Sequence, residues 1–363
     1  MYAQGSLINV VVHDRAQMNA NWGNQVAAKA PLRLGLAGGG TDVSPFSEEY
    51  GGVVVNATIS LFARVLITPS QDKYLKIQLS DLGLDFTYPL GEEIPTSGPD
   101  RLVAGVYNVL RKEAGKQREL PCNITTWIDV PPGSGLGSSS TLVVTLIGAL
   151  SSWFGLCFNP YEIAELAFYV EREYLGLAGG KQDQYAAVFG GFNYLEFGPG
   201  RRIVVEHLDL PRRVINSLES RMVLTNLGTS RFSSQIINAQ IKNVQLKQKK
   251  TLEALHFAKL QAISLKNKLL AGDVKEVGKI LYEGWQYKKR FAASITNPAI
   301  EKLIREILDA GAIGGKISGA GGGGFMMIFV EEKNRYQVIQ QLKKRNLDIF
   351  PFTFVERGLE IWQ

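Results

Sequence analysis

Apolar residues follow two different periods along the chain, and the alternation between them predicts a mixed fold of strands and helices. Residues 53–59 and 61–68 are rich in β-branched and apolar side chains, as buried strands are. Residues 123–130 alternate between apolar and polar side chains, and the pair Pro131-Pro132 ends this predicted strand. One face of it would carry Ile124, Thr126, Ile128 and Val130.

Helical spacing takes over after this strand. A helix is predicted to begin near Ser138, and its apolar stretch 142–150 falls far short of the ~20 residues that a membrane span needs. A second helix begins at Asn159, because an N-cap residue is followed by proline and then by Glu162 at the capping-box position. Its apolar positions are Ile163, Leu166, Ala167, Val170 and Tyr174.

The second half of the chain is predicted to be helical first and β-like at its end. Residues 232–271 and 274–293 form long helical stretches, and residues 325–330 and 349–355 are β-like runs. This order of elements predicts the α+β class.

We expect two domains, because a single core stops growing near ~250–300 residues and the chain has 363. The predicted division is an N-terminal extension at residues 1–25, a first domain at 26–200 and a second domain at 201–363. Residues 1–25 lack the basic start and apolar core of a signal peptide.

The charge of the chain is positive but local. The formal net charge is +6, and residues 241–290 alone carry twelve Lys or Arg against four Asp or Glu. A solvated helix face explains these lysines better than a nucleic-acid patch, because no aromatic platforms are interleaved with them. The two cysteines form no CxxC pair and the three histidines have no metal-ligand spacing, which favours a reducing cytoplasm and no zinc site.

Clusters of glycine mark the candidate binding site. Of 38 glycines, more than half fall in short clusters, and one cluster lies between the predicted strand 123–130 and the helix that begins near Ser138. Its exposed N–H groups, the positive N-terminus of the helix and three serine hydroxyls would form a cradle for an anion such as a triphosphate with a bound cation. The residues concerned are Pro132, Gly133, Ser134, Gly135, Leu136, Gly137, Ser138, Ser139 and Ser140.

Known nucleotide-binding fingerprints do not describe this cluster. The chain has no G-x-x-x-x-G-K-[ST] sequence, and the glycine spacing does not match a dinucleotide-binding turn. A purely structural glycine–serine turn is therefore the alternative that the residues themselves leave open.

Three motifs in order resemble those of the GHMP kinases. Residues 131–140 resemble the phosphate-binding signature, residues 30–42 the N-terminal substrate motif, and residues 316–325 the C-terminal motif. The resemblance runs from about residue 28 to the C-terminus. Within the family, residues 38–42 and 180–184 are most similar to kinases of D-glycero-D-manno-heptose 7-phosphate.

The resemblance implies a two-domain fold with the active site in the interdomain cleft, and ATP and Mg²⁺ as cofactors. Asp183 would accept the proton of the sugar hydroxyl or orient that hydroxyl, with Arg33 beside it. Glu171 and Ser139 would hold the magnesium ion. The competing interpretations are a turn-capping aspartate, a surface arginine, a helix-rim glutamate and an N-cap serine.

The same resemblance assigns a sugar site. Asp42 would grip sugar hydroxyls, next to Gly39, Gly40 and Thr41. Galactokinases carry glutamate and histidine where this chain has the two glycines, which suggests a roomier and less negative pocket; a tight turn is the alternative. A second phosphate subsite, for the phosphate that the sugar carries, would involve Thr229, Ser230 and Arg231 before a predicted helix, with Lys181 as another candidate; an ordinary helix cap is the alternative. Gly321 and Gly322 belong to the C-terminal glycine cluster, whose backbone would approach the phosphate loop.

The resemblance implies that D-glycero-D-manno-heptose 7-phosphate is phosphorylated on its anomeric hydroxyl, for the synthesis of a nucleotide-activated heptose. A kinase of an unphosphorylated sugar such as fucose or galactose, and a non-catalytic sugar or nucleotide sensor, are the alternatives. We expect a cytoplasmic protein with a small sugar phosphate as partner and neither nucleic acid nor membrane; the oligomeric state stays open, with a homodimer as one option.

Overall fold

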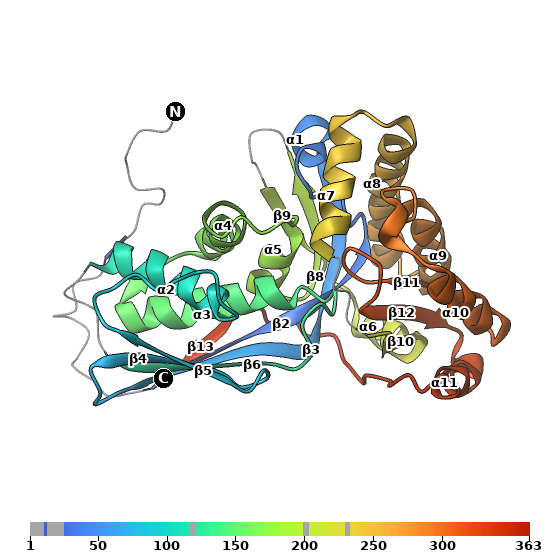
Figure 1. The fold of residues 1–363 in the computed structure, drawn as a ribbon. Coiled ribbons are helices and arrows are strands. Elements are labelled where there is room, and N and C mark those ends of the chain that lie inside the picture. The colour runs from blue at the N-terminus through green and yellow to red at the C-terminus, as the bar shows by residue number, and fades with distance from the viewer. Residues whose placement is uncertain (1–10, 13–24, 116–120, 199–202, 229–232) are drawn as a thin grey trace.

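The structure is a computed structural model that describes residues 11–12, 25–115, 121–198, 203–228 and 233–363. In these residues, one large sheet and one small sheet organise the two halves of the molecule (Figure 1). The large sheet has eight strands: β2 (Val26–Ala37), β3 (Gly52–Pro69), β4 (Tyr74–Leu79), β5 (Leu84–Pro89), β6 (Cys122–Ile128), β8 (Phe192–Phe197), β9 (Ile203–His207) and β13 (Glu360–Trp362). A separate short pair joins β1 (Val11–Val12) to β7 (Leu156–Cys157).

Strand β3 holds the large sheet together. Its first half pairs with β8 and its second half with β6, while β2 runs antiparallel along both halves. The prediction of two strands at 53–59 and 61–68 is wrong in number, because Ser60 does not interrupt the strand. The backbone N–H of Ser60 instead donates to the carbonyl of Thr353 at 2.9 Å.

One face of the large sheet is covered by helices (Figure 1). They are α2 (Arg101–Ala114), α3 (Ser138–Phe154), α4 (Pro160–Tyr169) and α5 (Gln182–Phe189), with a π-helical turn at Val170–Tyr174 after α4. The predicted starts at Ser138 and Asn159 are confirmed, and both hydrogen bonds of the Asn159–Glu162 capping box are present. The apolar stretch 142–150 lies buried inside α3, and none of the described helices has the length and apolarity to cross a bilayer.

The small sheet has the antiparallel order β10 (Met222–Asn226), β12 (Phe325–Val330), β11 (Ala312–Ile317). Strand β12 matches the predicted run 325–330 and is buried along its whole length. The helices of this half, together with α1 (Phe46–Tyr50), are α6 (Arg212–Arg221), α7 (Ser233–Gln245), α8 (Lys249–Leu270), α9 (Val277–Lys288), α10 (Pro298–Asp309) and α11 (Arg335–Lys343).

Two of the predicted stretches differ from the structure. Residues 232–271 form two helices, α7 and α8, because the chain turns at Lys247, whose φ of 51° is left-handed. Residues 349–355 are extended but are not a strand, since Pro351 has no N–H to donate and only single bridges form, at Ile349 and Phe354.

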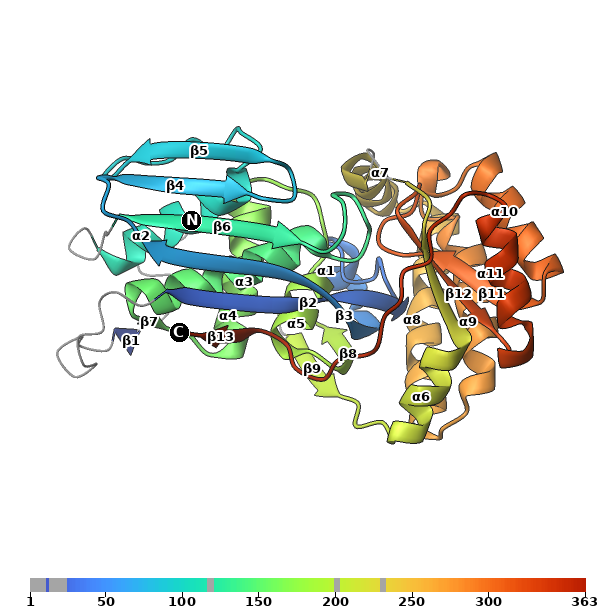
Figure 2. The ribbon, with the colours of Figure 1, turned by 90° about the horizontal axis from the view of Figure 1, so that it is seen from below.

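The two sheets share one hydrophobic cluster. It contains Leu34 of β2, Val55 of β3, Leu265 of α8 and Phe325 of β12. Strands β9 and β13 come after residue 200, yet β9 pairs with β8 and β13 with β2 (Figure 2). The α+β class is confirmed. The chain passes more than once between its two halves.

Candidate active site

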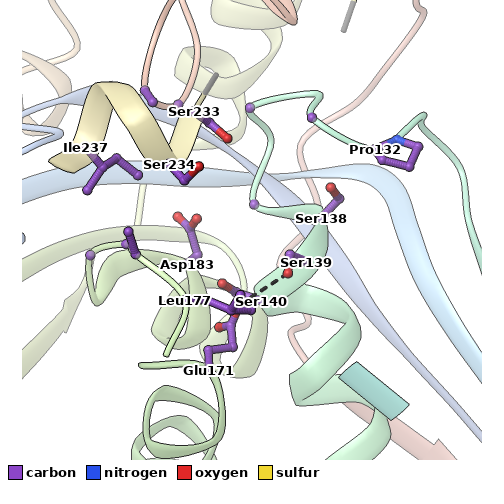
Figure 3. A pocket seen from close by; sticks show the side chains of 18 of the residues that line it. Pro132, Ser138, Ser139, Ser140, Glu171, Leu177, Asp183, Ser233, Ser234 and Ile237 are labelled. Carbon is purple, nitrogen blue, oxygen red and sulfur yellow. Dashed lines mark hydrogen bonds between the residues drawn. The ribbon is translucent and has the colours of Figure 1, made fainter. Parts of the chain in front are cut away.

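A cleft of about 790 Å³ opens where the two halves meet. Its walls come from β2, the phosphate loop (residues 132–140), the start of α5, the first turn of α7 and the C-terminal glycine loop (residues 318–324). Figure 3 shows Asp183 in this pocket between the serines of the phosphate loop and those of α7. Residues far apart in the sequence therefore face one another across a single space.

The phosphate loop presents its backbone to the cleft. Gly133, Gly135 and Gly137 have φ angles of 77°, 76° and 79°, which only glycine adopts readily. Helix α3 begins directly after Gly137, so its unsatisfied N–H groups and its positive dipole end point into the same space. This geometry suits a phosphate anion.

Not all nine predicted loop residues face the cleft. The residues that line it are Pro132, Gly133, Gly135, Gly137, Ser138, Ser139 and Ser140. Ser134 and Leu136 are buried and turn inward: Leu136 packs in the shared core, and the carbonyl of Ser134 accepts from Phe325 N at 2.8 Å. They anchor the loop instead of facing the pocket.

Arg33 and Asp183 form an ion pair at the centre of the cleft. Arg33 donates from Nε to Asp183 Oδ1 at 2.7 Å, and its Nη2 lies 2.6 Å from the same oxygen. Its Nη1 donates to the carbonyl of Gly135 at 2.7 Å, which ties the pair to the phosphate loop. Among the described residues none donates a hydrogen bond to Asp183 Oδ2, so this oxygen is open to a hydroxyl group.

Glu171 lies deeper, beside the start of α3. Its side chain is 1% exposed, and Oε1 accepts from Ser139 Oγ at 3.3 Å while Oε2 accepts from Gln184 Nε2 at 2.5 Å. Arg172 Nη1 lies 3.7 Å from Oε1. Glu171 and Ser139 thus offer two neighbouring oxygen ligands at the edge of the anion cradle (Figure 3).

Asp42 lines the cleft together with Gly39 and Gly40, but its carboxylate is engaged within the fold. Its Oδ1 accepts from Gly40 N at 3.0 Å and Gln182 Nε2 at 3.2 Å. Its Oδ2 accepts from Lys181 N at 3.0 Å and Gln182 N at 3.2 Å. A carboxylate has about four acceptor positions, and all are occupied. Asp42 therefore caps the N-terminus of α5, one residue before Asp183.

The turn around Gly39 and Gly40 is filled on one side. A Cβ on Gly40 would lie 2.9 Å from the ring of Phe291, and the φ of Gly40 is 98°. Gln240 Nε2 donates to the carbonyl of Gly40 at 2.8 Å. The space that glycine leaves at Gly40 is therefore taken by α7 and Phe291, which supports the tight-turn interpretation there. Thr41 is buried and bonds to Gly38 and Val53 within the turn.

The predicted subsite for a second phosphate is not assembled from Lys181. Lys181 Nζ lies 3.8 Å from Glu48 Oε1 and over the ring of Phe168, and the side chain does not line the cleft. Thr229, Ser230 and Arg231 lie outside the described residues.

The C-terminal glycine loop contacts the phosphate loop directly. Ser318 Oγ donates to the carbonyl of Gly135 at 2.9 Å, and a Cβ on Gly319 would lie 2.7 Å from Gly135 Cα. Of the two predicted glycines, Gly321 lines the cleft, whereas Gly322 donates its N–H to Ile295 O at 2.7 Å and does not line it. The predicted approach of the second half's backbone to the phosphate loop is present.

Two lysines in the cleft were not predicted from the sequence: Lys316 is buried, and Lys288 is partly exposed. Lys288 at the end of α9 and Lys316 in β11 both line it. Burial, with the nearby Arg33, lowers the pKa of Lys288 to about 7, and burial with the charge of Lys288 lowers the pKa of Lys316 well below its usual value. Lys316 belongs to the C-terminal motif and could have been noted; nothing in the sequence marks Lys288.

Two family models match the chain. The model of the GHMP kinases N terminal domain matches residues 101–191, and that of the GHMP kinases C terminal matches residues 265–348. The chain is 38% identical to a D-glycero-alpha-D-manno-heptose 7-phosphate kinase of Campylobacter jejuni, over 93% of this chain and 99% of that protein.

A solved structure and a more distant relative agree with this likeness. The structure, described as a D-glycero-D-manno-heptose 1-phosphate kinase from Bacteriodes thetaiotaomicron, superposes with a TM-score of 0.79 at 38% identity, covering 93% of this chain and 99% of that one. An L-fucokinase/L-fucose-1-P guanylyltransferase of Bacteroides fragilis is 27% identical over 92% of this chain, which spans 37% of that longer protein.

Proposed function

The chain belongs to the GHMP kinase family, and we propose that it is an ATP-dependent kinase of the anomeric hydroxyl of D-glycero-D-manno-heptose 7-phosphate. The observation that carries the chemistry is the Arg33–Asp183 pair, held at the phosphate loop with one carboxylate oxygen open to the cleft. The 38% identity to the Campylobacter heptose 7-phosphate kinase over nearly the full length of both chains supports the substrate.

Asp183 would act on the sugar hydroxyl. Its Oδ1 is committed to Arg33, so Oδ2 is the atom that accepts the hydroxyl's hydrogen bond. It would take the hydroxyl's proton as the sugar oxygen bonds to the γ-phosphorus of ATP and the bond from that phosphorus to the ADP oxygen breaks, releasing ADP. Arg33 orients the carboxylate, and its link to Gly135 places the hydroxyl next to the phosphate loop. Phosphoryl transfer needs mainly such positioning and charge stabilisation.

The residues around the phosphate loop fit ATP and a magnesium ion. ATP supplies the phosphoryl group, and Mg²⁺ neutralises the charge of the phosphates. Ser139 and the buried Glu171 offer hard oxygen ligands side by side. No group of three or more acidic, histidine or cysteine side chains gathers in the described residues. Magnesium commonly completes its shell with phosphate oxygens and waters, so this small ligand set is adequate.

The sugar would lie toward Gly39, Gly40 and the start of α7. Gln182 lines this end, and its Oε1 has no hydrogen-bond partner in the described residues although its Nε2 is held by Asp42. A sugar hydroxyl would satisfy that buried acceptor. A cytoplasmic location follows from this proposal, since ATP is the co-substrate, and the bisphosphate product suits synthesis of a nucleotide-activated heptose.

The test is a substrate screen with the full-length protein. Magnesium-dependent ADP release is measured with hexose and heptose phosphates and with their unphosphorylated parents. We expect the highest kcat/KM for the heptose 7-phosphate and a product with a new anomeric phosphate, identified by NMR. A higher kcat/KM for free fucose or galactose than for any sugar phosphate would contradict the proposed substrate and favour the unphosphorylated-sugar alternative.

A further inference from the structure

The side chains of Lys288 and Lys316 reach the cleft without an acidic partner. Lys288 Nζ donates to the carbonyl oxygens of Ile317, at 3.3 Å, and Gly319. Lys316 Nζ donates to the carbonyl of Leu36 at 3.1 Å. Neither ammonium group has a carboxylate of the described residues within 4.0 Å. Two lysine side chains, a buried Lys316 and a partly exposed Lys288, are thus held in the cleft by neutral groups alone.

This arrangement is costly unless an anion completes it. Buried charges in proteins are normally paired or bind a ligand of opposite charge. Here Arg33 adds a third cation beside the two lysines, and the two nearby carboxylates are engaged elsewhere: Asp183 by Arg33, Asp42 by the N-terminus of α5. Burial lowers the pKa of both lysines; the charge of Arg33 adds to this at Lys288, and the charges of Lys288 and Arg33 add to it at Lys316.

The lysines lie at the sugar end of the cleft. Lys316 is tied to Leu36, just before the Gly38–Gly40 turn, and Lys288 is three residues from Phe291, which covers Gly40. Gly319 stands between Lys288 and the phosphate loop, because its carbonyl faces the lysine while its Cα abuts Gly135. Neither lysine donates to any described residue of the phosphate loop.

A second element faces this end of the cleft. Ser233 and Ser234 open α7 and line the pocket, across Asp183 from the serines of the phosphate loop (Figure 3). The first turn of a helix has N–H groups without intrahelical partners. Hydroxyl and N–H donors of α7 therefore line the same cleft as the two ammonium groups.

We propose that Lys288 and Lys316 form a subsite for the phosphate group that the sugar already carries when it binds. An ammonium group has three N–H donors; Lys288 uses two on carbonyl oxygens and Lys316 one, which leaves three for phosphate oxygens. This inference rests on the proposed function, and it explains how the enzyme would distinguish a phosphorylated heptose from a free sugar. The phosphate on the sugar's far end would then hold the anomeric hydroxyl at Asp183.

Substitution of each lysine tests the subsite. In Lys288→Met and Lys316→Met the apolar stem is kept and the charge is lost. We expect KM for heptose 7-phosphate to rise about 10- to 100-fold, the usual loss for a charge-assisted hydrogen bond, with KM for ATP and for the unphosphorylated heptose within about twofold. Lys279→Met, which removes a charge from the exposed face of the same helix, is the matched control.

Three outcomes overturn the subsite. One is an equal rise in KM for the phosphorylated and unphosphorylated sugars. Another is a selective rise in KM for ATP, which would assign the lysines to the nucleotide. The third is an unchanged KM for heptose 7-phosphate in both variants. The proposed function fails separately, if the wild-type protein releases no ADP with any sugar phosphate.

Chemical labelling of the wild-type protein gives a test that no folding defect can obscure. Amines of lowered pKa react early with acetic anhydride near neutral pH, and the labelled lysines are identified by mass spectrometry. We expect heptose 7-phosphate, and inorganic phosphate at higher concentration, to protect Lys288 and Lys316, while Lys279 stays reactive. Protection by Mg-ATP alone, with none from either phosphate, would contradict the subsite.

Discussion

Two groups of charged residues face the same cleft, and they are compensated in opposite ways. Arg33 and Asp183 hold each other with nitrogen–oxygen distances of 2.6 and 2.7 Å. Lys288 and Lys316 are held by carbonyl oxygens only. The first group is complete within the fold, whereas the second leaves positive charge for a ligand to balance.

The difference teaches where the fold positions a reaction and where it selects a substrate. A paired carboxylate keeps its geometry whether or not substrate is present, which is what a residue that handles a proton needs. An unpaired buried cation lowers the stability of the free protein. Binding of an anion removes this destabilisation, and the free energy recovered strengthens the binding of that anion. The predictions below break or sharpen this contrast.

Loss of the carboxylate charge at Asp183 should have the largest effect. Asp183→Asn keeps the shape but removes the proton acceptor and leaves Arg33 unpaired, which makes this region resemble the lysine pair. We expect kcat to fall by about 10²- to 10⁴-fold with much smaller changes in KM. Turnover is measured as ADP release with heptose 7-phosphate.

The matched control is Asp129→Asn, because Asp129 also pairs with an arginine, Arg64, but does not line the cleft. It should leave kcat within about twofold, as surface changes usually do. Full turnover by Asp183→Asn would refute the role assigned to that carboxylate.

The paired region could be predicted from the sequence, whereas of the two lysines only Lys316 lies in a motif. The phosphate loop is one contiguous motif, so its glycines and serines alone predict an anion site. The resemblance to the family identified Asp183, Arg33 and Glu171, and the structure places all three in the same cleft. Lys288 gave no signal, because its neighbours Ile317 and Gly319 are set by the packing of α9 on β11.

Asp42 shows that a motif can place a residue in the cleft without revealing its contacts. Its position in the N-terminal motif suggested contact with the sugar, yet its four hydrogen bonds run to Gly40, Lys181 and Gln182. These contacts could not be predicted from the motif, because they form only when the N-terminus of α5 lies beside Asp42. The two segments are about 140 residues apart in the sequence. Likewise, a side chain at position 40 is excluded by the ring of Phe291, which is distant in the sequence.

The two regions should also differ in their dependence on pH. Lys288, with a pKa of about 7, faces Lys316, Arg33 and Asp42, and it loses its charge as the pH rises through that value. We expect kcat/KM for heptose 7-phosphate to fall above about pH 7, by up to tenfold per pH unit. The unphosphorylated heptose should not show this fall. Identical profiles for the two substrates would remove the link between Lys288 and the phosphate.

Stability should respond with opposite signs in the two regions. Arg33→Met leaves Asp183 unpaired, so we expect a loss of about 1–3 kcal/mol in the free energy of unfolding. Lys288→Met removes an uncompensated charge and should raise it by about 1 kcal/mol or more in the absence of ligand. Urea titration followed by circular dichroism measures both.

The sign of the lysine effect should follow pH. The pKa of Lys288 is about 7 in the folded protein and 10.5 by its ordinary value, so between these values the unfolded chain binds the proton and wild-type stability rises with pH. The advantage of Lys288→Met is therefore full below about pH 7 and shrinks toward pH 10.5. An advantage that grew with pH would mean that the cation is compensated in the fold.

The smallest effect is expected at Asp42, which joins the two functions of the cleft through α5. Asp42→Ala removes the carboxylate that accepts from the backbone N–H groups of Lys181 and Gln182 at the start of this helix, so we expect about 0.5–2 kcal/mol less stability, as for the loss of a capping side chain. Because Asp183 lies in the first turn of α5, kcat should fall as well, while KM for phosphorylated and unphosphorylated sugars should stay the same.

Asn297→Ala is the matched control: Asn297 caps α10 by accepting from Ile300 N at 2.9 Å. It should lose similar stability and keep its kcat. If Asp42→Ala raised KM for both sugars and preserved kcat, Asp42 would be a ligand of the sugar. Helix α5 would then hold Asp183 in place without the hydrogen bonds of Asp42.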